Sequence, residues 1–244
     1  MHGHSDCGRN QKGKIRNKIP SVHRSTDASK RQLLGQFTPM ISIFTPSHNP
    51  AKLAAAWQSI LRQGDVEFEW IVVVNGDAVY TNEDKRVKVI QAPDWMCGNV
   101  GALKRLACEN ATGDIYVELD HDDQLLPSCL KTIQSALDGR ENAFFYSATM
   151  EVGKTGEPIV YGTMFGWEHK EHKGKKFNVP FSATPRSLCE IFYAPNHVRA
   201  WKAATYWKAG GHDPRMPVCD DQDMIIRTYL AEAEFICHPE PLYL

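Results

Sequence analysis

One uninterrupted apolar segment does most to limit the folds open to this chain. Residues 68–74 read Phe-Glu-Trp-Ile-Val-Val-Val, with no alternation of apolar and polar side chains over the last five positions. Such a run is typical of a strand in a parallel sheet whose two faces are both covered by helices. The run ends at Asn75-Gly76-Asp77, which is a turn signal. The segment therefore predicts an α/β protein.

Strand and helix patterns alternate along the rest of the chain. The first helix has Asn49 as its N-cap and Pro50 as its first residue. Strands are expected at 40–45, 68–74, 87–90, 113–119, 143–150, 188–194, 197–201 and 233–238, and helices at 50–62, 99–109, 128–137, 203–209 and from 220 onward. This order predicts a single domain with a mostly parallel central sheet flanked by helices.

Residues 151–186 show no clear strand or helix pattern, and an exposed loop is expected at 166–176. The segment 166–176 within it is rich in Gly, Lys and His, and it lacks a clear apolar period. Long loops on compact domains are often lids or binding loops. A binding role is therefore expected for this region.

The composition fits one folded domain. The chain has 244 residues, 42% of them hydrophobic and 23% charged, so a substantial core can form. The net charge of −1 gives no reason to expect a nucleic-acid partner. The seven cysteines include no Cys-x-x-Cys pair, which argues against a zinc site or a disulfide framework and favours a cytoplasmic protein with reduced thiols. No apolar run approaches the roughly 20 residues that span a bilayer.

The charge is uneven, because the first part of the chain is basic. Residues 1–38 carry eight Lys and Arg against two Asp, with little apolar periodicity. Such a composition predicts a flexible tail. The alternative is a basic arm that makes peripheral contact with anionic lipid or with a partner.

Carboxylates gather directly after one of the expected strands. The strand at 113–119 runs into Asp120, Asp122 and Asp123. Crowded carboxylates repel one another unless a cation lies between them, and oxygen ligands suit Mg²⁺ or Mn²⁺. The alternative is a solvated acidic turn, but the apolar strand before the cluster and Leu125-Leu126-Pro127 after it place it at a packed edge.

A second acidic cluster begins the last helix. Asp220, Asp221 and Asp223 fall in its first turn, where acidic side chains also stabilise the helix dipole. Helix capping and catalysis are equally open for this cluster on the residues alone. Repulsion from Asp220 and Asp223 is expected to raise the pKa of Asp221.

Polar side chains follow three of the expected strands, at 46–49, 75–77 and 120–123. In open α/β sheets, ligands bind beyond the carboxyl ends of the strands. A nucleotide is therefore expected at this edge of the sheet.

The motifs in this order resemble those of the inverting glycosyltransferases of family 2. They are Pro-Ser-His-Asn at 46–49, Val-Val-Val-Asn-Gly-Asp at 72–77, Ala-Thr-Gly-Asp-Ile-Tyr-Val-Glu-Leu-Asp-His-Asp-Asp at 111–123, Gly-Gly-His-Asp at 210–213 and Asp-Asp-Gln-Asp-x-x-x-Arg at 220–227. The resemblance covers about residues 40–244. It implies a Rossmann-like GT-A domain at 39–244, with a nucleotide-binding half at 39–123 and an acceptor half at 124–244.

The resemblance also assigns nucleotide-binding residues. It implies contacts to the nucleotide or its diphosphate from Pro46, Ser47, His48, Asn49, Asn75, Asp77, Lys104, Arg105 and Asp120. Two positions depart from the family pattern, because Asn75 and Val74 stand where acidic residues are common. An Asn can still recognise uracil, since its amide both donates and accepts hydrogen bonds.

For the chemistry, the resemblance implies that Asp120 and Asp122 form an Asp-x-Asp motif that holds Mn²⁺ or Mg²⁺. His238 would complete the metal shell. Asp221 takes the place of the catalytic base, in an Asp-Asp pair where the family usually has Glu-Asp.

The implied activity is a metal-dependent, inverting hexosyl transfer from a nucleotide-diphosphate sugar, with UDP as the expected nucleotide, of the kind used in polysaccharide biosynthesis. The acceptor would be a hydroxyl of a glycan, a lipid-linked molecule or a protein. Two alternatives stay open. One is a non-catalytic nucleotide-sugar or glycan-binding module, in which Asp221 only caps a helix. The other is a nucleotidyltransferase, which is disfavoured because 46–49 contains neither a glycine nor a Lys or Arg for phosphate.

Overall fold

The structure is a computed structural model that describes residues 38–153, 155–160, 167–191 and 195–244. All of them belong to one unit, Thr38–Leu244. The basic tail predicted at 1–38 lies outside the described residues except for its last position. None of the described helices has both the length and the apolar character that crossing a bilayer requires.

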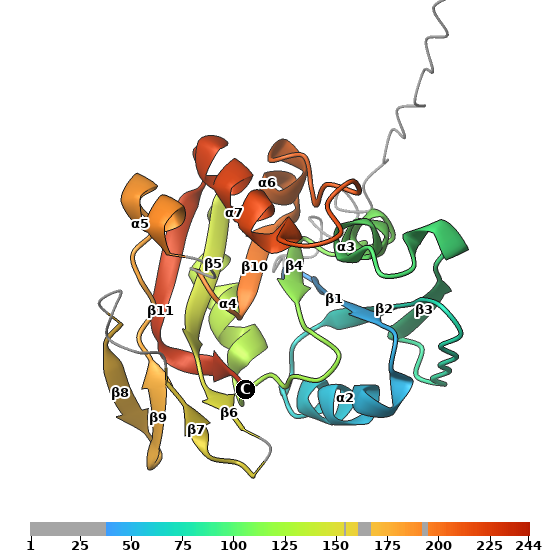
Figure 1. Ribbon diagram of the computed structural model, residues 1–244, viewed down its shortest axis with the longest axis horizontal. Helices are drawn as coiled ribbons and strands as arrows, with labels where there is room; N and C mark the ends of the chain where they lie inside the picture. Colours follow the sequence, from blue (N-terminus) through green and yellow to red (C-terminus); the bar gives the residue numbers. More distant parts are fainter. Residues whose placement is uncertain (1–37, 154, 161–166, 192–194) are drawn as a thin grey trace, which may run out of the picture. The chain divides into compact units, whose positions relative to one another are not determined.

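A mixed sheet forms the centre of the described unit (Figure 1). One half consists of parallel strands in the order β3-β2-β1-β4, and the other half contains β10, β5 and β11. β10 runs antiparallel between β4 and β5, whereas β11 is parallel to β5. The bounds are β1 Ile41–Ser47, β2 Phe68–Val74, β3 Val87–Gln91, β4 Ile115–Glu118, β5 Ala143–Thr149, β10 Arg199–Lys202 and β11 Glu234–Tyr243. The prediction of a mostly parallel central sheet is confirmed.

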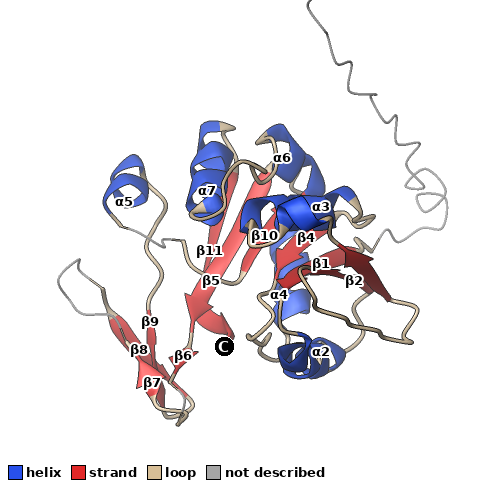
Figure 2. Cartoon of the chain, turned by 45° about the vertical axis from the view of Figure 1, so that its right-hand side comes forward, coloured by secondary structure: helices blue, strands red, loops and turns tan. Residues whose placement is uncertain are grey.

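Helices cover both faces of this sheet (Figure 2). α2 and α4 pack on one face, where their side chains join a core with Ile43 and Val117. α3, α6 and α7 pack on the other face, in a core that includes Phe44 and Tyr116. The α-helices are α2 Leu53–Leu61, α3 Val100–Glu109, α4 Cys129–Leu137, α5 Pro185–Glu190, α6 Ala203–Lys208 and α7 Asp220–Leu230, and short 3₁₀ turns occupy η2 Pro50–Lys52 and η3 Asp94–Met96.

Burial explains why β2 lacks an alternating pattern. Trp70, Ile71, Val72 and Val73 are all fully buried, and successive side chains enter opposite cores. Burying a large apolar side chain stabilises the fold by roughly 1.5–3 kcal/mol. Both faces of the strand therefore contribute to holding the helices in place.

The helix predicted at 99–109 is confirmed to within one residue at its start, whereas the start predicted at Asn49 and Pro50 is wrong for the α-helix. Asn99 is the N-cap of α3, and its side chain accepts a hydrogen bond from the backbone N–H of Ala102. Asn49 instead precedes the 3₁₀ turn η2, and its side chain makes no capping hydrogen bond. The α-helix that was expected from Pro50 begins at Leu53.

The region 151–186, where an exposed loop was expected at 166–176, contains strands instead. Two short hairpins occupy parts of it: β6 (Glu151–Val152) with β7 (Pro158–Ile159), and β8 (His169–His172) with β9 (Lys175–Asn178). The second hairpin turns at Lys173 and Gly174, which both have positive φ, as tight hairpin turns require. Its exposed edge position explains the polar sequence, because little apolar surface has to be buried there.

The strand predicted at 188–194 is also wrong over its described part. Residues 185–190 form α5, because Thr184 is an N-cap with a capping box to Ser187 and Pro185 occupies the first turn. Residues 192–194 lie outside the described residues. At the end of the chain, β11 continues to Tyr243, whereas the strand was expected to end at 238.

Candidate active site

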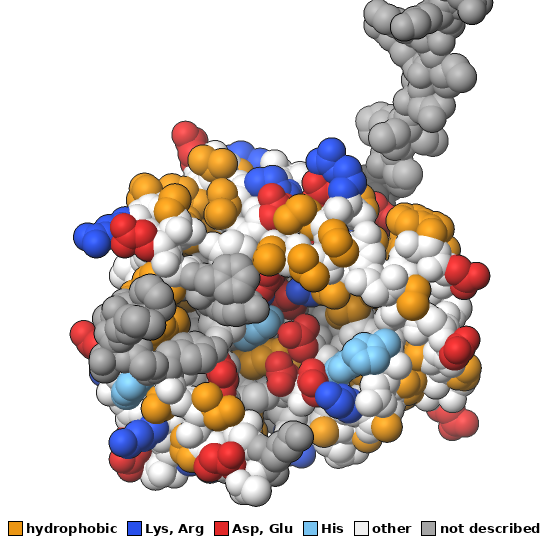
Figure 3. Space-filling model, viewed as in Figure 1, with side chains coloured by type: hydrophobic (Ala, Val, Ile, Leu, Met, Phe, Trp, Pro, Cys, Tyr) orange, Lys and Arg blue, Asp and Glu red, His pale blue; other side chains and the backbone are white. Residues whose placement is uncertain are grey.

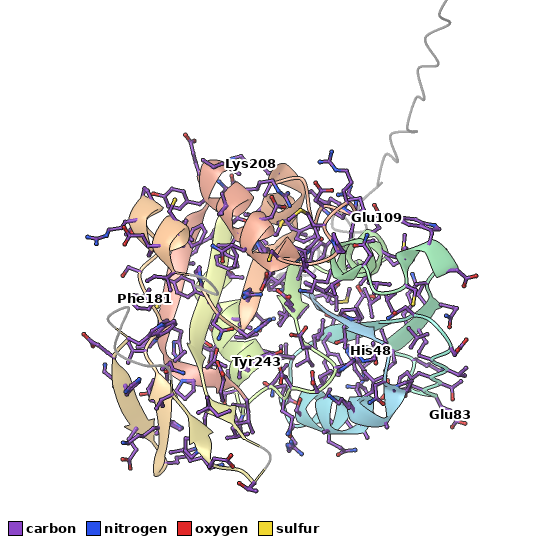
Figure 4. All side chains as sticks on the ribbon, in the orientation of Figure 1. His48, Glu83, Glu109, Phe181, Lys208 and Tyr243 are labelled. Atoms are coloured by element: carbon purple, nitrogen blue, oxygen red, sulfur yellow. The ribbon has the colours of Figure 1, made fainter. Side chains whose placement is uncertain are left out.

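Two cavities meet beyond the carboxyl end of β4. The first has a volume of about 260 Å³ and the second about 570 Å³, and both are lined by Asp120 and Asp122. Figure 3 shows acidic side chains gathered in the hollow at the centre of this face. Figure 4 labels His48, which lines the first cavity, and Tyr243, which lines the second.

The first cavity is built from the ends of β1, β2 and β4 and from α3. Asn75 connects two of its loops, because its amide nitrogen donates to the carbonyl of Ser47 at 3.1 Å and its oxygen accepts from the N–H of Gly98 at 3.5 Å. The rings of His48 and His121 meet edge to face, with centroids 4.8 Å apart. The lining residues are Pro46, Ser47, His48, Asn75, Gly98, Val100, Leu103, Lys104, Asp120, His121 and Asp122.

Three of the predicted nucleotide-binding residues do not line this cavity: Asn49, Asp77 and Arg105. The guanidinium of Arg105 donates to the carbonyls of Gly210 and His212, at 2.7 and 3.2 Å. Lys104, the other basic candidate, does line the cavity. The helix thus turns one of the two neighbouring cations toward the cavity and the other toward the 210–212 loop.

Asp120 and Asp122 line both cavities and, together with Asp123 of the second cavity, form an acidic wall. Burial and the charge of Asp120 raise the pKa of Asp123 to about 6. Burial acts in the same direction on Asp122, but a hydrogen bond from Lys52, with Nζ 2.7 Å from Oδ2, and the charges of His121 and Lys52 together outweigh it and lower the pKa of Asp122. Carboxylates in this arrangement fit a hard divalent cation, because they supply oxygen ligands and excess negative charge.

Asp221 lines the second cavity together with Asp120 and Asp122. The two acidic clusters, about a hundred positions apart in the sequence, therefore meet around one space. Asp220 lies instead in the protein interior, where its Oδ2 is 3.2 Å from Lys104 Nζ.

The expected rise in the pKa of Asp221 is wrong. Burial does raise this pKa, but Arg199 and then Lys104 outweigh burial and the net shift is downward. Arg199 Nη1 lies 3.0 Å from Asp221 Oδ2. The like charges on the same helix matter less than the cations that β10 and α3 supply.

Three residues of the site were not predicted from the sequence: Glu118, His197 and Arg199. Glu118 is fully buried at the end of β4, with Lys104 Nζ 2.6 Å from its Oε1. One signal was available, because a Glu within an apolar strand requires a buried cation. Arg199 and His197 gave no such signal, since their roles depend on where β10 enters the sheet.

His238, the predicted third metal ligand, lines a separate cavity of about 360 Å³, together with His172 and Glu240. The histidine near the acidic wall is His197, whose Nε2 lies 3.8 Å from Asp120 Oδ2. Glu118, Asp120 and His197 could bring ligand atoms within 4.8 Å of one another. Glu118 already faces two cations, Lys104 and Arg199, and Asp122, which pairs with Lys52, is not part of this group.

The sequence profile of Glycosyl transferase family 2 matches residues 42–193. Among solved structures, TarS of S. aureus (residues 1–349) superposes with a TM-score of 0.60 at 18% identity, over 84% of this chain and 59% of that one. Its complex with UDP gives 0.61 at 19% identity, over 84% and 59%, and its complex with UDP-GlcNAc gives 0.60 at 19%, over 84% and 57%. This chain thus spans less than two thirds of the length of those chains. None of the curated proteins compared gives a significant match.

Proposed function

Because the chain belongs to glycosyl transferase family 2, we propose that it is a metal-dependent, inverting glycosyltransferase that moves a hexose from a UDP-sugar to an acceptor hydroxyl. The observation that carries the proposal is the second cavity, in which Asp221 faces the same space as Asp120 and Asp122. A transferase of this kind needs negative charge to hold a divalent cation and, separately, a base for the acceptor. The two acidic clusters supply both.

The first cavity is the proposed site of the nucleotide. Pro46, Ser47 and His48 after β1, with Asn75 after β2, would hold the base and the ribose. Lys104 lines the same cavity and would face the diphosphate. The complexes of TarS with UDP and with UDP-GlcNAc support a UDP-sugar as the donor, since that protein shares the fold.

Asp120 and Asp122 would hold Mg²⁺ or Mn²⁺, which would neutralise the charge that develops on the departing diphosphate. Lys52 adds an ammonium group beside Asp122, 2.7 Å from its Oδ2. With the leaving group stabilised in this way, no carboxylic acid has to protonate it. A single base is then enough, in contrast to the paired carboxylates of glycosidases.

Asp221 is the proposed base. The acceptor hydroxyl, in the second cavity, gives its proton to a carboxylate oxygen of Asp221. Its oxygen forms the new bond to the anomeric carbon as the bond from that carbon to the diphosphate breaks. Attack from the face opposite the leaving group inverts the configuration. Asp221 is ionised at neutral pH, as a base must be, because Arg199 and Lys104 outweigh the effect of burial on its pKa.

The experiment is the Asp221→Asn variant, assayed for UDP release from a panel of UDP-sugars with Mn²⁺, alongside UDP binding by calorimetry. We expect UDP binding within about threefold of wild type and release slowed by roughly 10²–10⁴-fold, the usual contribution of a general base. The matched control is Asp223→Asn, because Asp223 pairs with Arg227 on the same helix, with Nη2 2.6 Å from Oδ2.

Two outcomes contradict the proposal. If Asp221→Asn keeps most of the wild-type rate, Asp221 is not the base. If the wild-type protein binds UDP-sugars but releases no UDP with any of them, the chain is a binding module.

A further inference from the structure

A buried group of charged side chains lies between the two cavities. Lys104 lines the first cavity and Arg199 lines the second. Glu118 lies between them, with its Oε1 2.6 Å from Lys104 Nζ and its Oε2 3.5 Å from Arg199 Nη1. The three side chains are almost completely excluded from solvent. Buried ion pairs therefore connect a residue that lines the first cavity with a residue that lines the second.

Arg199 holds one side of the Asp221 carboxylate. Its Nη1 lies 3.0 Å from Asp221 Oδ2, while the backbone N–H of Gln222 donates to Oδ1 at 2.7 Å. Each oxygen of Asp221 thus has one fixed cationic or amide partner. The directions in which the remaining lone pairs point are set by these two contacts.

The guanidinium of Arg199 is itself fixed from two other sides. Its Nε donates to the carbonyl of Pro195 at 3.0 Å, and Glu118 supplies a fully buried negative charge. A buried charge without a partner is costly, so Glu118 and Arg199 each stabilise the ionised form of the other. Only 1% of the Arg199 side chain is exposed, which leaves it little freedom to turn.

We propose that Arg199 is a positioning residue of the transfer reaction: anchored by Glu118, it fixes the direction in which Asp221 presents its oxygen to the acceptor hydroxyl. This inference rests on the proposed role of Asp221 as the base. Proton transfer depends steeply on geometry, so a carboxylate that can rotate is a poorer base than one held in place.

The same contacts make the pH dependence of the reaction depend on Arg199. Burial raises the pKa of Asp221, whereas Arg199 and Lys104 lower it. Without Arg199 the pKa of Asp221 rises, and the base becomes protonated at a higher pH. The ionisable groups that act on Asp221 directly are Arg199 of β10, Lys104 of α3, Glu118 of β4, Asp220 on its own helix and His212 in the loop before it. Across the second cavity it also faces the side chains of Asp120, Asp122, Asp123, Glu151 and His197.

The test compares Arg199→Met with Arg199→Lys in the UDP-sugar assay, each with a full pH profile and with UDP affinity measured separately. For Arg199→Met we expect kcat to fall by about 10²-fold or more, while the affinity for UDP stays within about threefold of wild type. The acid limb of the pH profile, where kcat falls as the base becomes protonated, should move to higher pH by about one unit. Arg199→Lys keeps the charge but not the planar guanidinium, so it should recover the position of the acid limb and only part of the rate.

Two further variants separate positioning from folding. Glu118→Gln removes the anchor but leaves Arg199 in place, and we expect a smaller fall in kcat. Because the charge of Glu118 raises the pKa of Asp221, this variant should not move the acid limb to higher pH. Arg227→Met is the matched control, because Arg227 also pairs with an Asp of α7 and donates to backbone carbonyls but does not touch Asp221. It should lower stability without moving the acid limb.

The inference is overturned if Arg199→Met keeps the wild-type kcat and acid limb, or if Arg227→Met shifts the acid limb as much as Arg199→Met does. If Arg199→Met fails to fold, Arg199→Lys and Glu118→Gln decide by the same readouts. Failure of the proposed function has a different signature, since the wild-type protein would then release no UDP at all, and the inference would fall with it.

Discussion

Replacing Lys104 with Met tests whether the buried charges hold the site together. Lys104 Nζ lies 2.6 Å from Glu118 Oε1 and 3.2 Å from Asp220 Oδ2, and the side chains of all three residues are at most 6% exposed. At an effective dielectric constant of about 20, these separations correspond to attractions of about 6 and about 5 kcal/mol. Dehydrating the ammonium group offsets several kcal/mol of this. The expected loss is therefore about 3–5 kcal/mol, the usual cost of removing one partner from a buried ion pair.

The assay is urea unfolding at pH 7.5, with Lys52→Met as the matched control. Lys52 also pairs with an Asp, at 2.7 Å, but 45% of its side chain and 47% of that of Asp122 are exposed. Such exposed pairs contribute about 1 kcal/mol or less. A loss below about 1 kcal/mol for Lys104→Met, or equal losses for the two variants, would refute the reasoning.

The same variant has a predicted pH dependence. In the wild-type protein, burial raises the pKa of Glu118, but Lys104 and Arg199 outweigh burial and hold it well below the ordinary value. This stability is present above the pKa of Glu118 in the unfolded chain and is lost as the pH falls. Without Lys104, protonation of the buried carboxylates becomes favourable in the folded state. The difference between variant and wild type should therefore shrink between pH 7.5 and pH 5, and a constant difference would contradict this explanation.

Three other predictions concern the metal, a buried histidine and a glycine. Asp122→Ala should abolish the Mn²⁺ dependence of UDP binding in calorimetry; an unchanged dependence would exclude Asp122 as a ligand. Burial lowers the pKa of His212 to about 3, so its stabilising contribution falls as the pH drops below the unfolded value of about 6.5. His212→Gln should thus reduce the slope of the free energy of unfolding against pH by about 1.4 kcal/mol per pH unit between pH 6.5 and 5. Urea unfolding measures this slope, and an unchanged slope would contradict the prediction. Gly101→Ala would bring a Cβ within 2.5 Å of the Asp213 carbonyl, and a loss of roughly 1–3 kcal/mol is expected; wild-type stability would show that the 213–216 loop adjusts freely.

Much of the fold could be predicted because its signals are local. The apolar run of β2 indicated burial on two faces, and the structure confirms this. The β8–β9 hairpin was missed because an edge strand with one exposed face can be polar throughout. Its turn at Lys173-Gly174 was the signal that could have identified it.

The proximity of the two acidic clusters could be predicted from the sequence for a different reason. Asp120 ends a strand and Asp221 starts the last helix, and the rule that ligands bind at the carboxyl ends of strands, joined to the resemblance, predicts that both face one space. The buried partners could not be predicted in this way. Glu118 contacts Arg199 only because β10 lies antiparallel between β4 and β5. No local sequence pattern predicts that β10 takes this place in the sheet.

The most direct test of the central claim is a crystal structure of the protein with UDP and Mn²⁺, in which anomalous scattering locates the metal ion. We predict UDP in the first cavity and the manganese peak beside the carboxylates of Asp120 and Asp122, with Asp221 facing the diphosphate across the second cavity. A manganese peak away from both aspartates, or UDP bound outside the first cavity, would contradict the account.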